Sequence, residues 1–463
     1  MTDIKDIRRV YFIGIGGIGM SSLARYFKFH GKQVSGYDRT ETQLTKKLVE
    51  EGISVHYHEE PDLVPRDADL VVYTPAIPAG HQELDFYLKN GYPVLKRSEV
   101  LGLITQSSFN ICIAGTHGKT TVTTMIAHLL RDSGYGCNAF LGGISVNYNS
   151  NFWSNEREVC VIEADEYDRS FLRLSPDIAV ITAMDADHLD IYGNAEAVEQ
   201  AFIEFSEKLK KGGYLLTRAG LKRESGLRGE DHQTYSVRES KADIRGTDIR
   251  IQNGIYVFDV QAPDWELREI ELPMGGLHNV ENMTAAIAVA KRLSIDKEKI
   301  KKAVLSFKGV KRRFEYIIAP AADAKRKGGS IFIDDYAHHP EELRALIGGA
   351  KALFPERKLV LIFQPHLFSR TRDFAPGFAE SLDMADQVIL LPIYPARELP
   401  IAGVSSQLIL DRMQKGKGIL MEKKELLGWL EKKAEAMRSG ELIITAGAGD
   451  IDAMVEPIKK LIE

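Results

Sequence analysis

The chain has 463 residues, which at roughly 100–200 residues per domain predicts about three domains. Hydrophobic residues make up 44% of the sequence and charged residues 27%, as is typical of a globular protein with a buried core. Lys and Arg number 60 against 65 Asp and Glu, and this net charge of −5 excludes a polybasic surface for nucleic acid or an anionic membrane.

Cysteine usage and the N-terminal residues indicate the compartment. The three cysteines, Cys112, Cys137 and Cys160, lack metal-ligand spacing and lie in or beside apolar stretches, which is typical of buried, reduced thiols. Residues 1–6 have no apolar core of the signal-peptide type, and no apolar run approaches the ~20 residues of a membrane span. We therefore expect a cytoplasmic protein without a membrane partner.

The first predicted unit is a strand, a glycine-rich turn and a helix. Gly14, Gly16 and Gly19 form the pattern G-x-G-x-x-G, and a second strand then ends at Asp38. A Rossmann unit uses such an acid to hold a ribose hydroxyl and places the pyrophosphate at the helix start. NAD, a UDP-sugar or another diphosphate nucleotide would suit this pattern, and a glycine turn that serves packing alone is the alternative.

A third strand, residues 70–73, leads into a rigid Pro-rich loop from Thr74 to Gly80. In open α/β folds this carboxyl edge of the sheet is where ligands bind. We expect the first domain to span residues 1–106, with a linker at residues 107–108.

Residues 110–125 predict a strand, a phosphate loop and a helix. Such a loop supplies glycine N–H groups for phosphate oxygens, a lysine for charge on the outer phosphates and a hydroxyl for Mg2+. The position five residues before the Gly-Lys pair, usually glycine, is Ile113, so the loop is short. A glycine-rich turn with a chance lysine is the alternative. The candidate residues of the loop are Gly115, Thr116, His117, Gly118, Lys119, Thr120 and Thr121.

Two apolar strands that follow end in acidic residues. The polar residues after the first strand are Glu163, Asp165, Glu166 and Asp168, and those after the second are Asp185, Asp187, His188 and Asp190. Acids at the carboxyl ends of strands beside a phosphate loop commonly hold hydrated Mg2+ with one or two protein ligands. A solvated acidic loop is the alternative for each cluster taken singly.

Residues 226–263 are polar and interrupted by glycine, and they predict a β-rich excursion. A helix then begins near His278, Asn279 and Asn282, whose side chains would suit a base or a sugar. Ordinary capping by Asn279 is the alternative there. We expect the central domain to span residues 107–309.

A basic cluster at residues 308–313 precedes a renewed alternation of strands and helices. This alternation predicts a third α/β domain, residues 310–463, with a mostly parallel sheet. Its polar groups cluster just after the strands, at the edge expected to face the nucleotide.

Seven motifs together occur in the order seen in Mur ligases, and the resemblance covers essentially the full chain. They are Gly115-Thr-His-Gly-Lys-Thr-Thr, Glu163-Ala-Asp-Glu166, Asp185-Ala-Asp-His188, His278-Asn-Val-Glu-Asn282, Arg313-Phe-Glu, Asp335-Tyr-Ala-His338-His-Pro and Phe363-Gln-Pro-His366. The resemblance implies an α/β fold of three domains. These are an N-terminal Rossmann-like domain for a UDP-sugar, a central P-loop ATPase with a parallel sheet, and a C-terminal Rossmann-like domain that closes over ATP and contacts an amino acid.

Residue-by-residue matching to this family implies the following roles. Catalysis is assigned to Lys119, Glu166 and His188, and Mg2+ binding to Thr120, Glu166 and His188. ATP binding is assigned to residues 115–121 together with Asn282, Arg313 and Asp335. UDP-sugar binding is assigned to Gly16, Gly17, Ile18, Gly19, Asp38, Thr74 and Arg97. Amino-acid binding is assigned to Tyr336, His338, His366 and Arg370.

The activity that the resemblance implies is ATP-dependent ligation of L-alanine to the lactyl carboxyl of UDP-N-acetylmuramate in peptidoglycan synthesis. The reaction would pass through an acyl phosphate, use Mg2+ and give ADP and phosphate. The expected partners are these small molecules, without nucleic acid, and the expected state is a monomer or weak homodimer. Several sister ligases have a modified lysine where this chain reads residues 201–204 without one, in agreement with the alanine-adding branch.

One position departs from the family pattern. Alanine-adding members often read His-Arg-Tyr-Thr-Arg, whereas this chain has Leu367 in place of the first arginine. Selectivity among L-alanine, glycine and L-serine therefore stays open. A ligase that attaches a murein tripeptide to the same sugar nucleotide is the nearest alternative. An NAD-dependent oxidoreductase would explain only residues 14–38, and a nucleotide-gated binding module would not explain the polar strand ends of the third domain.

Overall fold

A computed structural model describes residues 4–185, 189–252, 254–320, 329–396, 398–414, 416, 418–438 and 440–463. The chain forms two compact units. The first is built from Met1–Thr247, Val260–Arg268 and Glu281–Ser306, and the second from Asp248–Asp259, Glu269–Val280 and Phe307–Glu463. Within the described residues, no helix combines the length and the apolar character that crossing a membrane requires.

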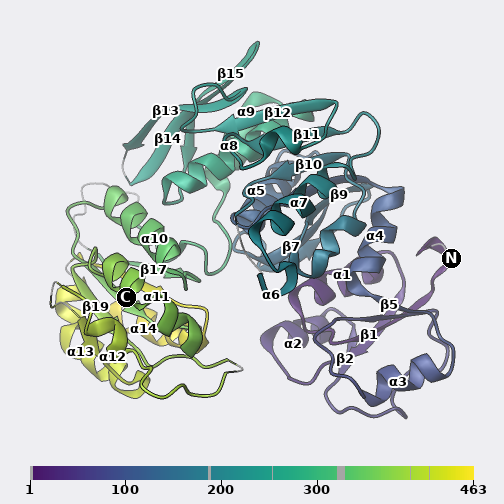
Figure 1. The fold of residues 1–463 in the computed structure, drawn as a ribbon, viewed down its shortest axis with the longest axis horizontal. Coiled ribbons are helices and arrows are strands. Elements are labelled where there is room, and N and C mark those ends of the chain that lie inside the picture. Colours follow the sequence, from purple (N-terminus) through teal and green to yellow (C-terminus); the bar gives the residue numbers. More distant parts are fainter. Residues whose placement is uncertain are drawn as a thin grey trace. The chain divides into compact units, whose positions relative to one another are not determined.

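The first sheet is parallel, with the strand order β3-β2-β1-β4-β5. Figure 1 labels β1, β2 and β5 of this sheet. The chain turns from one side of β1 to the other at β4, so the carboxyl ends of these two strands flank the crevice where Rossmann-like sheets bind nucleotides. The strands are β1 (Arg9–Ile13), β2 (Gln33–Tyr37), β3 (Ser54–His56), β4 (Leu70–Tyr73) and β5 (Val94–Lys96). The helices are η1 (Ile4–Asp6), α1 (Ile18–Phe29), α2 (Gln43–Glu50), α3 (Gln82–Lys89) and α4 (Arg97–Ser107).

The second sheet has the order β15-β14-β13-β12-β11-β10-β6-β9-β7-β8. Neighbouring strands from β13 to β7 are parallel, and β8 returns antiparallel to β7 as a hairpin. The strands are β6 (Phe109–Ala114), β7 (Asn138–Ser145), β8 (Ser150–Trp153), β9 (Val159–Glu163), β10 (Ile178–Ile181), β11 (Tyr214–Arg218), β12 (Asp231–Ser236), β13 (Ile244–Gln252), β14 (Ile255–Ala262) and β15 (Trp265–Leu272). The helices are α5 (Lys119–Asp132), η2 (Tyr167–Arg173), α6 (Leu189–Tyr192), α7 (Ala195–Ser206), η3 (Glu224–Gly226), α8 (Leu277–Arg292) and α9 (Lys297–Ser306). The predicted β-rich excursion is confirmed by β12, β13 and β14.

The third sheet has the order β16-β17-β21-β18-β19-β20, with β16 as an antiparallel edge on an otherwise parallel sheet. The strands are β16 (Glu315–Ile318), β17 (Ile331–Asp335), β18 (Leu359–Phe363), β19 (Gln387–Leu390), β20 (Gly418–Leu420) and β21 (Leu442–Ala446). The helices are α10 (Pro340–Leu353), α11 (Phe368–Leu382), α12 (Gln407–Leu410), α13 (Lys423–Arg438), η4 (Asp450–Met454) and α14 (Val455–Ile462). The predicted fold class is thus confirmed, whereas the exact domain boundaries stay predictions.

One hydrophobic core joins the first sheet to the phosphate-loop sheet inside the first unit. Tyr26 of α1 packs against Phe140 of β7, with ring centroids 5.4 Å apart, and Phe140 packs against Phe152 of β8 at 5.2 Å. The junction between the two sheets is shorter than the predicted linker, because α4 continues through Ser107 and β6 begins at Phe109. The helix that follows the first glycine turn is therefore packed directly on the sheet that holds the phosphate loop.

Candidate active site

The phosphate loop joins β6 to α5, and its two glycines have backbone conformations that a side chain would strain. Gly115 has φ +141°, and a Cβ atom there would overlap the Thr182 hydroxyl. Gly118 has φ +81° and forms the N-cap of α5, which leaves the first N–H groups of that helix available to an anion. The predicted strand, loop and helix are present, with Lys119 and Thr120 in the first turn of the helix.

Lys119 is held by the loop and by an acid from the neighbouring strand. Its Nζ donates to the Gly115 carbonyl at 2.7 Å and to Glu166 Oε1 at 2.8 Å. Glu166 is 1% exposed, and its second oxygen, Oε2, is buried without a hydrogen-bond partner among the described residues. Burial raises the pKa of Glu166, and the nearby Lys119 ammonium opposes the rise. The pair therefore places at the phosphate loop a cation and a buried carboxylate oxygen that has no hydrogen-bond partner among the described residues.

Thr120 contacts a different acid. Its hydroxyl donates to Glu163 Oε1 at 2.9 Å, and Glu163 Oε2 accepts from the backbone N–H of Gly142 at 2.9 Å. Burial raises the pKa of Glu163 as well. Sequence reasoning identified Glu163 only as one of several strand-end acids. The signal that could have selected it is its place as the last residue of the apolar strand β9, beside β6.

Two of the other predicted loop residues, Thr116 and His117, lie beside Asp185. The Thr116 hydroxyl accepts from the Asp185 N–H at 3.1 Å, Thr121 is buried in α5, and His117 is 63% exposed beside Asp185. Asn282, predicted on the adenine side, lies against the loop, because a Cβ atom on Gly118 would be 3.1 Å from its Oδ1. His188 lies outside the described residues.

The start of α8 contains the residues predicted to suit a base or a sugar, His278, Asn279 and Asn282. The Asn279 side chain is buried and donates to the Gly275 carbonyl at 2.6 Å, which is a local backbone contact. His278 is exposed near the start of α8. Asn279 therefore has a local contact inside the helix and is not its N-cap, while the roles predicted for His278 and Asn282 stay predictions.

The glycine turn after β1 gathers the residues predicted for the UDP-sugar. The Gly16 N–H donates to Asp38 Oδ2 at 2.7 Å, so the acid at the end of β2 holds the turn itself. A Cβ atom on Gly19 would lie 2.9 Å from Arg97 Nη1, and one on Gly14 would lie 2.9 Å from Thr74 Cγ2. Gly17 is the N-cap of α1, and Ile18 is its first residue. The structure brings this predicted set together at the carboxyl edge of the first sheet.

A cavity of about 160 Å3 is lined by helices α1 and α4 on one side and by residues of β7 and β9 on the other. Its polar and small lining residues include Gly19, Ser22, Arg97, Gly142, Glu163 and Asp165. Arg97 faces the carboxylates of Asp165 and Glu163 across this space. The cavity therefore joins the nucleotide-type turn of the first sheet to the acid that contacts the phosphate-loop threonine.

The residues predicted for the amino acid lie together in the second unit, after β17 and β18. The rings of Tyr336 and His338 are 5.2 Å apart, and those of His338 and His366 are 5.9 Å apart. Arg370 Nη1 lies 3.4 Å from His366 Nδ1. Burial lowers the pKa of His338, and burial together with the neighbouring charges lowers that of His366 to about 4. Both histidines are therefore neutral near pH 7.

Two residues predicted for ATP in its closed site lie next to this group. Asp335 accepts the N–H groups of Phe314 at 2.6 Å and Ala337 at 2.7 Å. Burial raises the pKa of Asp335 to about 6, with Arg313 opposing the rise. The Arg313 guanidinium lies 5.3 Å from the centre of the Tyr336 ring. Asp335 thus holds the two turns around β17, which positions Tyr336.

A third acid cluster, Asp248, Asp259 and Glu269, lies on β13, β14 and β15. It does not resemble a prepared metal site, because Arg250 already pairs with Asp248 at 2.6 Å and with Glu269. All three acids are at the surface or half-buried. We assign no ligand to it.

The fold and site define a phosphate-loop protein in which helices of a Rossmann-like sheet share a cavity with Glu163, the acid that contacts the loop threonine. Family models for the "Mur ligase family, catalytic domain", the "Mur ligase middle domain" and the "Mur ligase, glutamate ligase domain" match residues 9–108, 113–290 and 312–449. The chain belongs to the Mur ligase family, which confirms the resemblance inferred from the seven motifs.

Individual relatives agree with this assignment over the full length. The chain is 46% identical over 464 residues to the UDP-N-acetylmuramate--L-alanine ligase of Flavobacterium johnsoniae, covering 99% of each chain. It is 47% identical over 464 residues to the ligase of the same name from Phocaeicola vulgatus, covering 98% of each. The solved structure of UDP-N-acetylmuramate-alanine ligase from Thermotoga maritima is similar with a TM-score of 0.81 at 29% identity, covering 98% of each chain. A murein peptide ligase from Psychrobacter arcticus has a TM-score of 0.66 at 21% identity over 98% of each chain, which shows the fold alone.

Proposed function

We propose that this protein ligates L-alanine to the lactyl carboxyl of UDP-N-acetylmuramate with ATP as co-substrate, releasing ADP and phosphate. The observation that supports this most directly is the cavity walled by Gly19 and Arg97 on one side and by Glu163 on the other. It extends from the start of α1, beside a turn suited to a sugar nucleotide, to Glu163, which contacts the threonine of a loop suited to ATP. The ligases at 46% and 47% identity, which bear this activity in their names, support the same substrates.

The first step that we propose is phosphoryl transfer, because a carboxylate is a poor electrophile. A lactyl carboxylate oxygen attacks the γ-phosphorus of ATP, the bond to the bridging oxygen breaks, and ADP leaves. Lys119 would leave its contact with the Gly115 carbonyl to bind the outer phosphates, while N–H groups at the start of α5 hold phosphate oxygens. The low exposure of Lys119, 15%, strengthens its interaction with the charge that develops.

The second step is attack of the amine of L-alanine on the acyl carbon, with loss of phosphate. The amine must arrive neutral, and its remaining proton passes to an acceptor that we leave unassigned. Tyr336, His338, His366 and Arg370 are the residues that we propose around the amino acid. Because both histidines are neutral near pH 7, Arg370 provides the charge for the substrate carboxylate.

The donor set at the loop fits Mg2+. Hydroxyl and carboxylate oxygens are its usual protein ligands, and Glu166 Oε2 is a buried acceptor without a partner among the described residues. Thr120 and Glu166 would hold the ion, together with His188, and its chemistry would be to neutralise phosphate charge. Glu163 is a further candidate because it already accepts from the Thr120 hydroxyl.

Phosphate release tests the proposal. Purified protein with ATP, Mg2+ and UDP-N-acetylmuramate should release phosphate when L-alanine is added, and the panel should include glycine, L-serine and the murein tripeptide. Oxygen-18 placed in the lactyl carboxyl should appear in the released phosphate. Release with tripeptide but not with L-alanine would instead favour a recycling ligase, and unlabelled phosphate would exclude the acyl phosphate. Because ATP and a sugar nucleotide are the substrates, we also propose a cytoplasmic location.

A further inference from the structure

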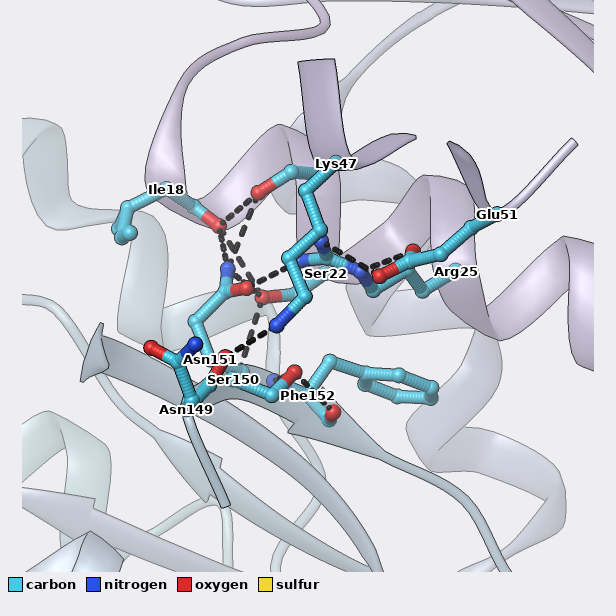
Figure 2. A network of polar contacts seen from close by, with 10 residues as sticks. Ile18, Ser22, Arg25, Lys47, Glu51, Asn149, Ser150, Asn151 and Phe152 are labelled. Carbon is cyan, nitrogen blue, oxygen red and sulfur yellow. Dashed lines mark hydrogen bonds and ion pairs between the residues drawn. The ribbon is translucent and has the colours of Figure 1, made fainter. Parts of the chain in front are cut away.

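Helix α1 and strand β8 are joined by a buried polar network centred on Asn151 (Figure 2). Asn151 is fully buried, and its Nδ2 donates to the Ile18 carbonyl at 2.6 Å, Ser22 Oγ at 2.7 Å and Ser21 Oγ at 3.0 Å. The Ser22 hydroxyl also lies 3.2 Å from the backbone carbonyl of Asn151 and can donate to it. The amide of one hairpin residue thus contacts the first carbonyl of α1 and two hydroxyls in the first turns of that helix.

The other end of the Asn151 side chain holds the same helix. Its Oδ1 accepts from Arg25, which is 7% exposed and makes a two-point ion pair with Glu51 at 2.6 and 3.1 Å. Lys47 of α2 donates to the Asn149 carbonyl in the turn before β8 (Figure 2). The donor and acceptor ends of Asn151 are therefore both engaged by α1.

The same hairpin contacts the phosphate-loop region at two other places. The Gly142 N–H donates to Glu163, whose other oxygen accepts from Thr120. The Tyr148 hydroxyl lies 2.8 Å from Nδ1 of His128 in α5. The β7–β8 hairpin consequently links the helix of the phosphate loop to the helix of the sugar-nucleotide turn.

We propose that Asn151 is a positioning residue, which sets the first turn of α1, and with it the bound sugar nucleotide, against the phosphate loop. Two of its partners, Ile18 and Ser22, line the cavity between the two sites. Phosphoryl transfer requires reacting atoms about 3–3.5 Å apart, and a displacement of about 1 Å can cost roughly 100-fold in rate. Loss of the network should therefore reduce turnover more than it reduces the affinity for either nucleotide. This inference rests on the proposed function.

The experiment compares Asn151→Ala and Asn151→Asp with Asn147→Ala. In the Asn151→Asp variant the new carboxylate still accepts from Arg25, but it cannot donate to the Ile18 carbonyl or to the serine hydroxyls. The retained Arg25 contact also favours folding of this variant. Asn147 is a matched control in the same hairpin, whose side chain donates to the Ser306 carbonyl at 2.7 Å. Calorimetric Kd values for UDP-N-acetylmuramate and ATP are measured separately, and kcat is measured by phosphate release.

Both Asn151 variants should lose about 10- to 100-fold in kcat, with each separate Kd within about 3-fold of the parent and Asn147→Ala within about 2-fold in kcat. Unchanged kcat in the folded variants would overturn the inference. So would a raised Kd for the sugar nucleotide with kcat intact, since Asn151 would then only support α1 locally. If the parent itself releases no phosphate with any amino acid, the proposed function fails and this inference fails with it. If the parent turns over and the Asn151 variants have an unchanged kcat, this inference is refuted while the proposed function stands.

Discussion

Replacement of Lys119 by methionine tests the centre of the site, because it removes the ammonium and keeps most of the aliphatic stem. Loss of one preorganised charge or donor at a transferring group costs about 3 kcal/mol or more, so kcat should fall by roughly 100- to 1000-fold. The affinity for UDP-N-acetylmuramate should stay within a few-fold, since its predicted residues belong to the first sheet. Phosphate release and calorimetric binding measure the two effects.

The same substitution should also lower stability, for a reason visible in the structure. Glu166 is 1% exposed and would lose its ion pair with Lys119 Nζ, which has a length of 2.8 Å. Removing one member of a buried pair costs about 3–5 kcal/mol, and the lower end applies because Lys119 is 15% exposed. Without the ammonium, the folded-state pKa of Glu166 rises further above its unfolded value. At low pH Glu166 in the variant is protonated and carries no uncompensated charge, so the loss of stability is small. The difference in Tm between the parent and the variant should therefore grow as pH rises from about 5 to 8.

The double variant Lys119→Met with Glu166→Gln separates the two effects. It removes the uncompensated charge, so Tm should recover towards the parent at pH 8 while turnover stays low. Recovery of most of the turnover would refute the reasoning, because Lys119 would then act only as a counter-ion for Glu166. A fall in sugar-nucleotide affinity as large as the fall in kcat would argue against the assignment of the sugar to the first sheet.

Three further predictions concern the metal, the third sheet and the amino acid. Glu166→Gln should raise the Mg2+ concentration for half-maximal activity, because its open Oε2 is a proposed ligand, and an unchanged Mg2+ titration would return Glu166 to a structural role. Burial raises the pKa of Asp334 to about 7, so the folded state favours the protonated carboxyl. The stability that this protonation contributes is fully present below about pH 4 and is lost as pH rises through 7. Asp334→Asn should therefore become more stable relative to the parent between about pH 5 and 8, by about 2–4 °C in Tm per kcal/mol, and a constant difference in Tm would contradict this. Arg370→Ala should raise KM for L-alanine by about 10- to 150-fold, with KM for ATP little changed, and the opposite pattern would assign Arg370 to the nucleotide.

The sequence predicted those parts of the site that lie within one strand, turn and helix. Gly115, Gly118 and Lys119 could be placed because the loop chemistry demands their types at that spacing, and the turn from Gly14 to Gly19 for the same reason. The structure adds which carboxylate each residue at the start of α5 contacts. Lys119 contacts Glu166 while Thr120 contacts Glu163, and no spacing rule distinguishes two carboxylates three residues apart after a strand.

Contacts across the two packed sheets were beyond sequence reasoning for a different reason. Asn151 is the second residue of β8, just after the polar turn from β7, where an asparagine is ordinary for its local hydrogen bonding. Its partners Ser22 and Arg25 lie more than 120 residues earlier, on helix α1, where both are buried. Only the packing of α1 on β7 and β8 makes these side chains one network.

In the group predicted to bind the amino acid, the residue at position 367 and the protonation of His366 together decide which positive charges are available. Leu367 stands where the resemblance to the family predicts a first arginine. It has φ +68° just before α11, and its N–H donates to the Tyr394 carbonyl at 2.9 Å. With the pKa of His366 lowered to about 4, the ring that contacts Arg370 is neutral near pH 7 and cannot substitute for the missing cation. We therefore propose that Arg370 recognises the substrate carboxylate by charge, and that the shape of the surrounding rings decides between L-alanine, glycine and L-serine.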